Sequence, residues 1–202
     1  MMLRPQRLET PRLILRRFET RDIATFAAYR ADPEVARYQG WQVPYSYQQA
    51  RQFVMDETSR ETIEPDQWVQ LAIELKARDA MLGAKLGAML GAMVGDCAFY
   101  LSANDPRQGE IGMTLARAYQ GQGFATEAVA RLLDYLFGEL DLHRVRANCD
   151  PENTASIRLL ERIGMRHEGR WVQSLWFKGR WADEDWYAML RQEWETRQNR
   201  AR

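Results

Sequence analysis

Apolar residues recur along the chain with two different spacings, and the spacing changes from segment to segment. Alternating or β-branched runs predict strands over 12–18, 68–75, 94–101, 109–115, 144–149, 170–177 and 186–190. Stripes with a period near 3.6 residues predict helices over 21–30, 46–59, 123–140 and 153–163. No linker rich in Pro, Ser or Gly interrupts this order. We therefore expect residues 1–202 to form a single α/β domain.

One segment follows neither spacing. Residues 80–95 read AMLGAKLGAMLGAMVG, a near-tandem repeat of Leu, Gly, Ala and Met or Lys. We interpret it as an insertion that expands the turn between two strands, because long insertions add little closure entropy. A lid, a partner-binding surface and a strand pair that slips register remain alternatives. If it is a turn, deletion of 83–93 should leave ligand binding nearly unchanged.

Composition and charge exclude several classes of protein. The 28 Lys and Arg residues balance the 28 Asp and Glu residues, so the basic excess of a nucleic-acid binder is missing. Cys97 and Cys149 stand outside any CxxC or Cys/His cluster, so we expect no metal site. Residues 1–10 lack the apolar core of a signal peptide, and the uncharged apolar stretch 86–95 is about half the ~20 residues of a membrane span. We expect a cytoplasmic protein that binds neither nucleic acid nor membrane.

The residues typical of a binding site are concentrated in 110–128, which read EIGMTLARAYQGQGFATEA. A predicted strand leads here through a turn rich in Gly and Gln into a predicted helix. Such a junction directs free backbone N–H groups and the positive end of the helix dipole at one point, which suits a pyrophosphate. Gly121 and Gly123 permit positive φ and close approach of the backbone. The hydroxyl of Thr126 is placed to reach a phosphate oxygen, although the segment alone is also compatible with an ordinary loop.

Three segments resemble one family. Residues 120–125, QGQGFA, resemble the Gln/Arg-x-x-Gly-x-Gly/Ala signature of the GNAT acetyltransferases and match neither a P-loop nor a Rossmann fingerprint. Residues 150–165, DPENTASIRLLERIGM, resemble the N-x-x-S helix ending in LLE-x-x-GF of the ribosomal-protein N-terminal acetyltransferases, the RimJ/RimL type, with Met165 replacing an aromatic. Residues 8–16, LETPRLILR, resemble the entry strand of that subfamily. The resemblance thus extends from about residue 8 to about residue 190.

This resemblance implies a GNAT fold, an α/β architecture whose mixed, mostly antiparallel central sheet is splayed between two strands and flanked by helices. It implies that the arm of acetyl-CoA lies between the strands 109–115 and 144–149 and pairs with backbone near Thr114 to Ala116. An exposed N–H there would polarise the thioester carbonyl. The implied cofactor-binding residues are Leu115, Ala116, Gln120, Gly121, Gln122, Gly123, Phe124, Ala125, Thr126 and Asn153.

The catalytic roles are assigned to two residues. Ser156 lies one helical turn beyond Asn153 and is the candidate acid that protonates the leaving thiolate. Glu110 is the candidate base, acting through water, as in relatives with an acid at this place on the central strand. Simpler interpretations remain for these residues and for Asn153. Asn153 is also a good N-cap, Ser156 is compatible with a solvated hydroxyl, and Glu110 is compatible with a surface carboxylate. His143, His167 and Cys149 are weaker candidates, because in the family the amine attacks the thioester directly.

The implied activity is transfer of an acetyl group from acetyl-CoA to a primary amine. The subfamily favours the N-terminal amine of a protein or peptide, and an α-amine with a pKa near ~8 needs less help from a base than a lysine near ~10.4. A small amine (an aminoglycoside, a polyamine or a toxin resembling an amino acid) and a non-catalytic CoA-binding domain remain alternatives. We expect the amine pocket to be built by residues 38–41, the helix after Ser46 and the hairpin 171–186. The protein is expected to be a monomer or a homodimer.

Overall fold

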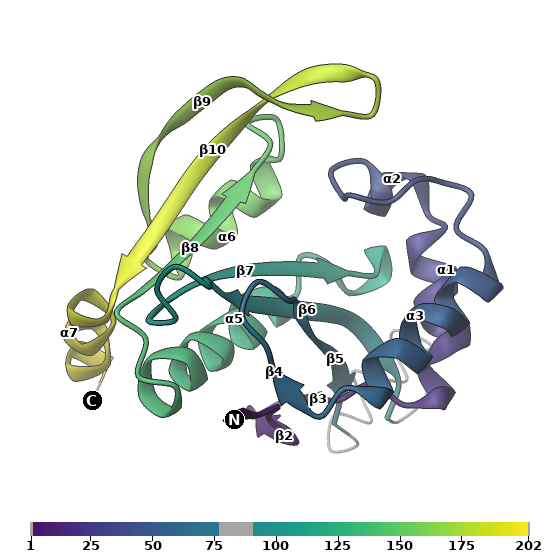
Figure 1. Ribbon diagram of the computed structural model, residues 1–202, viewed down its shortest axis with the longest axis horizontal. Helices are drawn as coiled ribbons and strands as arrows, with labels where there is room; N and C mark the ends of the chain where they lie inside the picture. The colour runs from purple at the N-terminus through teal and green to yellow at the C-terminus, as the bar shows by residue number, and fades with distance from the viewer. Residues whose placement is uncertain (1, 77–90, 202) are drawn as a thin grey trace.

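The computed structural model describes residues 2–76 and 91–201, and its centre is a mixed β-sheet (Figure 1). The sheet has eight strands in the order β2-β3-β5-β6-β7-β8-β10-β9. All neighbouring strands are antiparallel except β7 and β8. The strands are β2 (Arg7–Glu9), β3 (Leu13–Arg16), β5 (Val69–Leu75), β6 (Met93–Leu101), β7 (Gln108–Leu115), β8 (Arg144–Cys149), β9 (Arg166–Phe177) and β10 (Arg180–Leu190). Two short strands, β1 (Met2–Leu3) and β4 (Thr62–Ile63), form a separate ribbon.

Helices cover the sheet on both sides, so the expected α/β architecture is confirmed. They are α1 (Ile23–Arg30), α2 (Pro33–Ala36), α3 (Tyr47–Ser59), α5 (Phe124–Asp134), α6 (Thr154–Arg162) and α7 (Arg191–Ala201). One buried cluster packs α1 and α3 against the sheet, and a larger one packs α5 against β3, β5, β6 and β7. In the described part of the chain, no helix is long and apolar enough to cross a membrane.

Local sequence accounts for where the helices begin. Ser46 and Gln49 form a capping box that starts α3 at the predicted position. Asn153 caps α6, and Gly164 with φ 86° follows its C-terminal end. The stripe predicted for 123–140 is buried in the larger cluster, but its last turn, Tyr135–Glu139, has π geometry.

The sheet opens between β7 and β8, as the family resemblance implied. The two strands are paired only at Gln108–Arg144, Gly109–Val145 and Glu110–Arg146. Beyond Glu110, β7 continues to Leu115 while β8 continues to Cys149 without further pairing between them. This divergence leaves one edge of β7 open inside the molecule.

The end of the repeat belongs to the core rather than to a turn. Residues 80–90 lie outside the described residues, but Met93 pairs with Glu74 and is 3% exposed in the cluster of α1 and α3. A Cβ on Gly95 would lie 2.2 Å from the carbonyl oxygen of Thr114, so only glycine fits between β6 and β7. The expected turn therefore does not extend to Met93, and deletion of 83–93 would also remove a buried residue of β6.

Candidate active site

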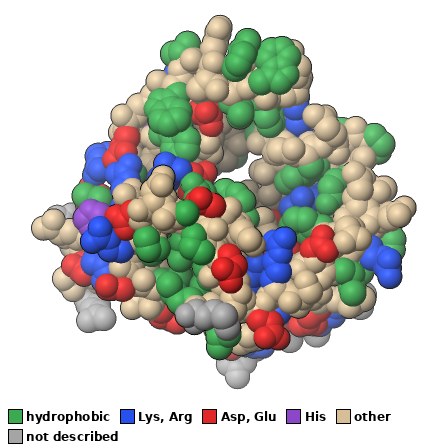
Figure 2. Space-filling model, in the orientation of Figure 1, with side chains coloured by type: hydrophobic (Ala, Val, Ile, Leu, Met, Phe, Trp, Pro, Cys, Tyr) green, Lys and Arg blue, Asp and Glu red, His purple; other side chains and the backbone are tan. Residues whose placement is uncertain are grey.

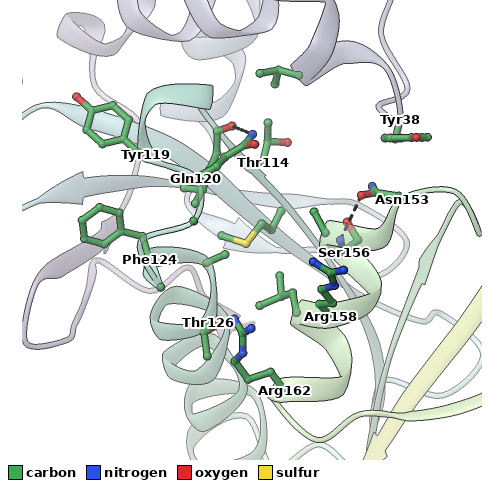
Figure 3. Close-up of a pocket in the computed structure, with 18 of the residues that line it drawn as sticks. Tyr38, Thr114, Tyr119, Gln120, Phe124, Thr126, Asn153, Ser156, Arg158 and Arg162 are labelled. Atoms are coloured by element: carbon green, nitrogen blue, oxygen red, sulfur yellow. Dashed lines mark hydrogen bonds between the residues drawn. The ribbon is translucent and has the colours of Figure 1, made fainter. Parts of the chain in front are cut away.

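A cavity of about 420 Å³ occupies the place where β7 and β8 separate (Figure 3). Its walls come from the end of β7, the loop before α5, the first turn of α5, one face of α6 and the segment after α2. Nine expected site residues line it: Leu115, Gln120, Gly121, Gly123, Phe124, Ala125, Thr126, Asn153 and Ser156. The cavity therefore brings together expected site residues that are up to 41 positions apart in the chain.

The glycine-rich loop has the backbone conformation that the sequence required. Gly121 has φ 74° and Gly123, the N-cap of α5, has φ 80°. Both values lie in the left-handed region that favours glycine. The loop thereby presents the N-terminal end of α5 to the cavity, with its free N–H groups and positive dipole.

Arg12, on the strand entry, fixes this loop from outside the cavity. Its Nη1 donates to the Gln122 carbonyl oxygen at 3.1 Å, its Nε donates to Glu127 at 2.6 Å, and its guanidinium lies 4.5 Å from the centre of the Phe124 ring. Burial alone would raise the pKa of Glu127, but hydrogen bonds from Thr10 and Arg12 hold that pKa below its ordinary value. The negative charge in the first turn of α5 is thus neutralised locally, which preserves the attraction of this helix end for an anion.

Thr126 supplies an independent indication of a ligand. Its Oγ1 is buried and has no hydrogen-bond partner among the described residues. A buried hydroxyl without a partner is destabilising, and such groups are rare in folded proteins. Figure 3 shows Thr126 on the helix wall of the cavity, where a phosphate oxygen would satisfy it.

The open edge of β7 presents the backbone of Leu115, as expected, together with that of Met113, which was not expected. The Ala116 N–H donates to the Val94 carbonyl at 3.0 Å, and Ala116 does not line the cavity, so this N–H is not free to pair with a thioester arm. Because antiparallel residues alternate in direction, Met113 and Leu115 instead point their N–H and C=O groups away from β6, toward the cavity. Their carbonyl oxygens accept hydrogen bonds from side-chain amides, from Gln39 at 3.4 Å and Gln120 at 3.0 Å. The N–H groups of Met113 and Leu115 are thus the ones placed to pair with a thioester arm.

The start of α6 combines a capping and a lining role. Asn153 Oδ1 accepts a hydrogen bond from the Ser156 backbone N–H at 3.2 Å, and both residues line the cavity (Figure 3). The cap engages only one atom of the Asn153 amide and does not engage the Ser156 hydroxyl. Capping and ligand binding are therefore compatible at these two positions.

Besides Ala116, two expected site residues lie outside the cavity. Gln122 turns its side-chain amide to the Ala118 carbonyl at 2.9 Å and gives its own carbonyl to Arg12. Glu110 is only 9% exposed and accepts from Arg146 Nε at 2.9 Å, while Arg146 also donates to the Tyr100 hydroxyl at 2.7 Å. Burial raises the pKa of Glu110, and the charge of Arg146 opposes that rise.

Replacement of Glu110 by Gln is expected to lower the rate at neutral pH, and the deficit should shrink as pH rises. An amine already deprotonated in solution needs no base, and the raised pKa of Glu110 moves the basic form of the wild-type carboxyl to higher pH than an ordinary Glu. The test is kcat/KM from pH ~6 to ~10, with the exposed Glu195→Gln as control. A wild-type profile in Glu110→Gln would leave a water held by backbone groups as the acceptor.

A second, smaller cavity of about 90 Å³ adjoins the first, since Tyr38 lines both. It lies between the ends of β8 and β10, and Figure 2 shows the surface hollowed between the β9–β10 hairpin and the region around α2. Its other lining residues are Asn148, Cys149, Asp150, Leu175, Phe177, Ala182, Asp183 and Glu184. Of the expected amine pocket, the hairpin and Tyr38 are present here, whereas α3 lines neither cavity.

The other residues considered from the sequence, Trp41, Cys149 and His167, make contacts within the protein outside the large cavity. The centre of the Trp41 ring lies 4.0 Å from the Arg30 guanidinium carbon, and Trp41 Nε1 donates to the Arg30 carbonyl. Trp41 therefore packs against Arg30. Burial raises the pKa of the Cys149 thiol to about 12, which opposes a thiolate nucleophile. His167 lies 3.4 Å from Asp185 and 5.0 Å from the Tyr187 ring. Among the described residues, no group of three His, Cys, Asp or Glu is arranged to hold a metal ion.

Comparison with known proteins identifies the family. Residues 12–166 match the model described as "Acetyltransferase (GNAT) domain". The chain is 33% identical over 189 residues to "Uncharacterized N-acetyltransferase p20" of Bacillus licheniformis, which covers 93% of this chain and 97% of that protein. It superposes with a TM-score of 0.79 and 29% identity on an acetyltransferase (GNAT family) of Bacillus anthracis, over 93% and 100% of the two chains. A RimJ of Mycobacterium smegmatis solved with CoA-disulfide has the same fold, with a TM-score of 0.76 and 24% identity over 96% and 91%.

The chain therefore belongs to the GNAT acetyltransferase family. It is an acetyl-CoA-dependent N-acetyltransferase with the splayed α/β sheet of that fold. The 420 Å³ cavity has features that suit an acyl-CoA. The N-terminal end of α5 and the unpartnered Thr126 hydroxyl suit its phosphates, and the open edge of β7 suits its extended arm.

Sequence reasoning missed several residues of this cavity. Arg158 and Arg162 on α6 line it, although their spacing resembles an ordinary solvated helix face. Met113 also lines it, and nothing in its local sequence indicates a ligand. Only the position of α6 beside α5 turns the two arginines toward the cavity.

Proposed function

We propose that the chain acetylates the N-terminal amine of a protein or peptide, and that the amine attacks the thioester directly. The observation that carries the proposal is the small second cavity, which adjoins an open surface. About 90 Å³ accommodates little more than a terminal residue. Trp171 pairs with Glu184 across the hairpin and is 55% exposed, so the cavity continues onto accessible aromatic surface.

This aromatic surface, formed by Trp68, Tyr100, Trp171 and Trp186, suits an extended chain. The Trp171 and Trp186 rings are 4.9 Å apart, as are those of Trp68 and Tyr100. Arg146 joins the two pairs, since it donates to the Tyr100 hydroxyl and lies 4.9 Å from the Trp186 ring. Rigid aromatic groups of this kind are common in surfaces that bind peptides.

The proposed reaction uses the groups already described. The N–H groups of Met113 and Leu115 polarise the acetyl carbonyl, and the amine nitrogen forms a bond to the carbonyl carbon as the carbon–sulfur bond breaks. The Ser156 hydroxyl gives its proton to the departing sulfur and regains one from water. Glu110 takes the amine proton through water.

Names of similar proteins support two substrate classes. Solved structures with this fold include a "Ribosomal-protein-S5-alanine Acetyltransferase" of Vibrio fischeri and a spermidine N-acetyltransferase of Vibrio cholerae in complex with CoA and spermine. A polyamine is the second candidate acceptor. It is favoured by Asp150, Asp183 and Glu184, three carboxylates that line the small cavity.

The proposal is tested by following CoA release with a panel of amines. We expect peptides with a free N-terminus to be acetylated, and the same peptides with a blocked N-terminus to be inert even when they contain lysine. Spermidine, an aminoglycoside and free amino acids complete the panel. Preference for spermidine would overturn the peptide assignment in favour of the second candidate. Binding of acetyl-CoA without turnover of any amine would indicate a non-catalytic CoA-binding domain.

A further inference from the structure

The tip of the β9–β10 hairpin touches α2 across the opening between β7 and β8 (Figure 1). Lys178 Nζ donates to the carbonyl oxygen of Ala36, the last residue of α2, at 2.6 Å, although the two residues are 142 positions apart in the chain. The hairpin continues the sheet from β8, whereas α2 packs through Val35 into the cluster of α1 and α3 on the other side of the opening. This hydrogen bond therefore spans the opening.

The same bond joins the two walls of the small cavity. Phe177, the neighbour of Lys178, lines that cavity on the hairpin side, and Tyr38, two positions beyond Ala36, lines it on the other side. Tyr38 also crosses the opening, since its hydroxyl donates to the carbonyl oxygen of Glu152 at 3.4 Å. The separation of the two walls is thus set at Tyr38 and at the hairpin tip.

The backbone at the hairpin tip is unfavourable for a lysine. Phe177 pairs with Arg180, so Lys178 and Gly179 form a turn of two residues, with φ 49° and 86°. Turns with two positive φ values favour Asn, Asp and Gly. Only three of the 28 basic residues are lysines, so a general use of lysine on the surface does not explain this one. The contact made by its side chain does explain it.

We propose that Lys178 is a specificity-determining residue for the acceptor. By holding the hairpin tip to α2, it fixes the walls of the small cavity at a separation that admits a small first residue and rejects a bulky one. The inference rests on the proposed function, in which the cavity of about 90 Å³ receives the terminal residue of a peptide. Without the bond, the hairpin tip can move away from α2 and the cavity can widen.

Lys178→Met removes the ammonium group and keeps an unbranched side chain of similar length. Loss of a hydrogen bond from a charged group typically shifts an equilibrium about tenfold. The ratio of kcat/KM for a peptide that begins with Phe to kcat/KM for the same peptide beginning with Ala should therefore rise about tenfold, chiefly through a lower KM for the Phe peptide. Lys178→Arg retains a donor for the Ala36 carbonyl and should keep the wild-type ratio.

Steady-state kinetics with both peptides, together with an acetyl-CoA titration, test the proposal. The Kd of acetyl-CoA should stay unchanged, because Lys178 does not line the large cavity. Arg107→Met controls for the loss of an exposed positive charge, since Arg107 pairs with Asp105 at 2.9 Å in the turn between β6 and β7. A wild-type ratio in Lys178→Met would overturn the proposal, and so would an equal change for both peptides, because the bond would then serve stability alone.

A different result would identify a failure of the proposed function. Wild-type protein that acetylates neither peptide would overturn the peptide assignment. The same variants would then be compared on primary amines of increasing size. A gain in Lys178→Met confined to the larger amines would support the role of Lys178, and a uniform change would overturn it.

Discussion

Gly123→Asp is expected to abolish the rise in melting temperature that acetyl-CoA gives the wild-type protein. At ~100 times its Kd a ligand stabilises the folded state by about 2.7 kcal/mol. For a domain of this size that corresponds to a rise in Tm of roughly 5–10 °C. In the variant, a carboxylate would stand at the N-cap of α5, where the pyrophosphate is expected, and would repel it.

The same substitution also forces a side chain into a left-handed backbone conformation, with its Cβ 3.4 Å from Arg12 Nη2. Gly179→Asp controls for that strain, because Gly179 has φ 86°, has open space around it and lies in the β9–β10 turn. Both variants should lose some stability without ligand, but only Gly123→Asp should lose the response to acetyl-CoA. A full response in Gly123→Asp would place the donor somewhere other than this loop.

Ser156→Ala is expected to lower kcat about 10²-fold while leaving the Kd of acetyl-CoA nearly unchanged. General acid–base groups typically contribute ~10²–10⁴-fold, and the low end applies because the CoA thiolate is a good leaving group. The helix should start normally in the variant, since the Asn153 cap bonds to the backbone N–H of Ser156 and not to its hydroxyl. Steady-state kinetics together with a binding titration separate the two effects.

Ser174→Ala provides the matched control for that experiment. Its hydroxyl lies on the hairpin and donates to Glu184 at 2.8 Å, outside the large cavity. Its removal should leave the Kd of acetyl-CoA and the chemical step unchanged, although the KM of the amine can shift. A parallel loss of acetyl-CoA affinity in Ser156→Ala would make Ser156 a binding group instead of an acid.

The parts of the site predicted from sequence are those built by consecutive residues. The loop 120–125 and the Asn153 cap depend on glycine conformations and side-chain bonds that reach only three or four positions along the chain. Backbone conformations and short-range hydrogen bonds of this kind can be predicted without knowledge of the tertiary structure. The same holds for α5, whose apolar stripe determines which face is buried.

The parts that were missed depend on contacts between distant strands and helices. Whether Met113 or Ala116 offers a free N–H depends on which residues of β7 direct their backbone groups at β6. The sequence does not show which alternate residues these are. Glu110 meets Arg146 only because β7 and β8 pair in parallel at that point. The C-terminal helix α7 was not predicted because its sequence is mostly polar and shows no apolar stripe, although Trp194 stacks on Phe137 at 5.6 Å and donates to Asp134.

Because only three residue pairs join β7 to β8, the sheet consists of two halves that are held together by a short stretch of strand pairing. One half carries the strands from β2 to β7, and the other carries β8, β10 and β9. An extended arm hydrogen-bonded along Met113 and Leu115 would lie where a further strand is missing and would bridge part of that gap. Loss of the acyl donor then removes a structural tie between the halves as well as a reactant, so donor binding should increase amide protection at the β7 edge before any amine is present.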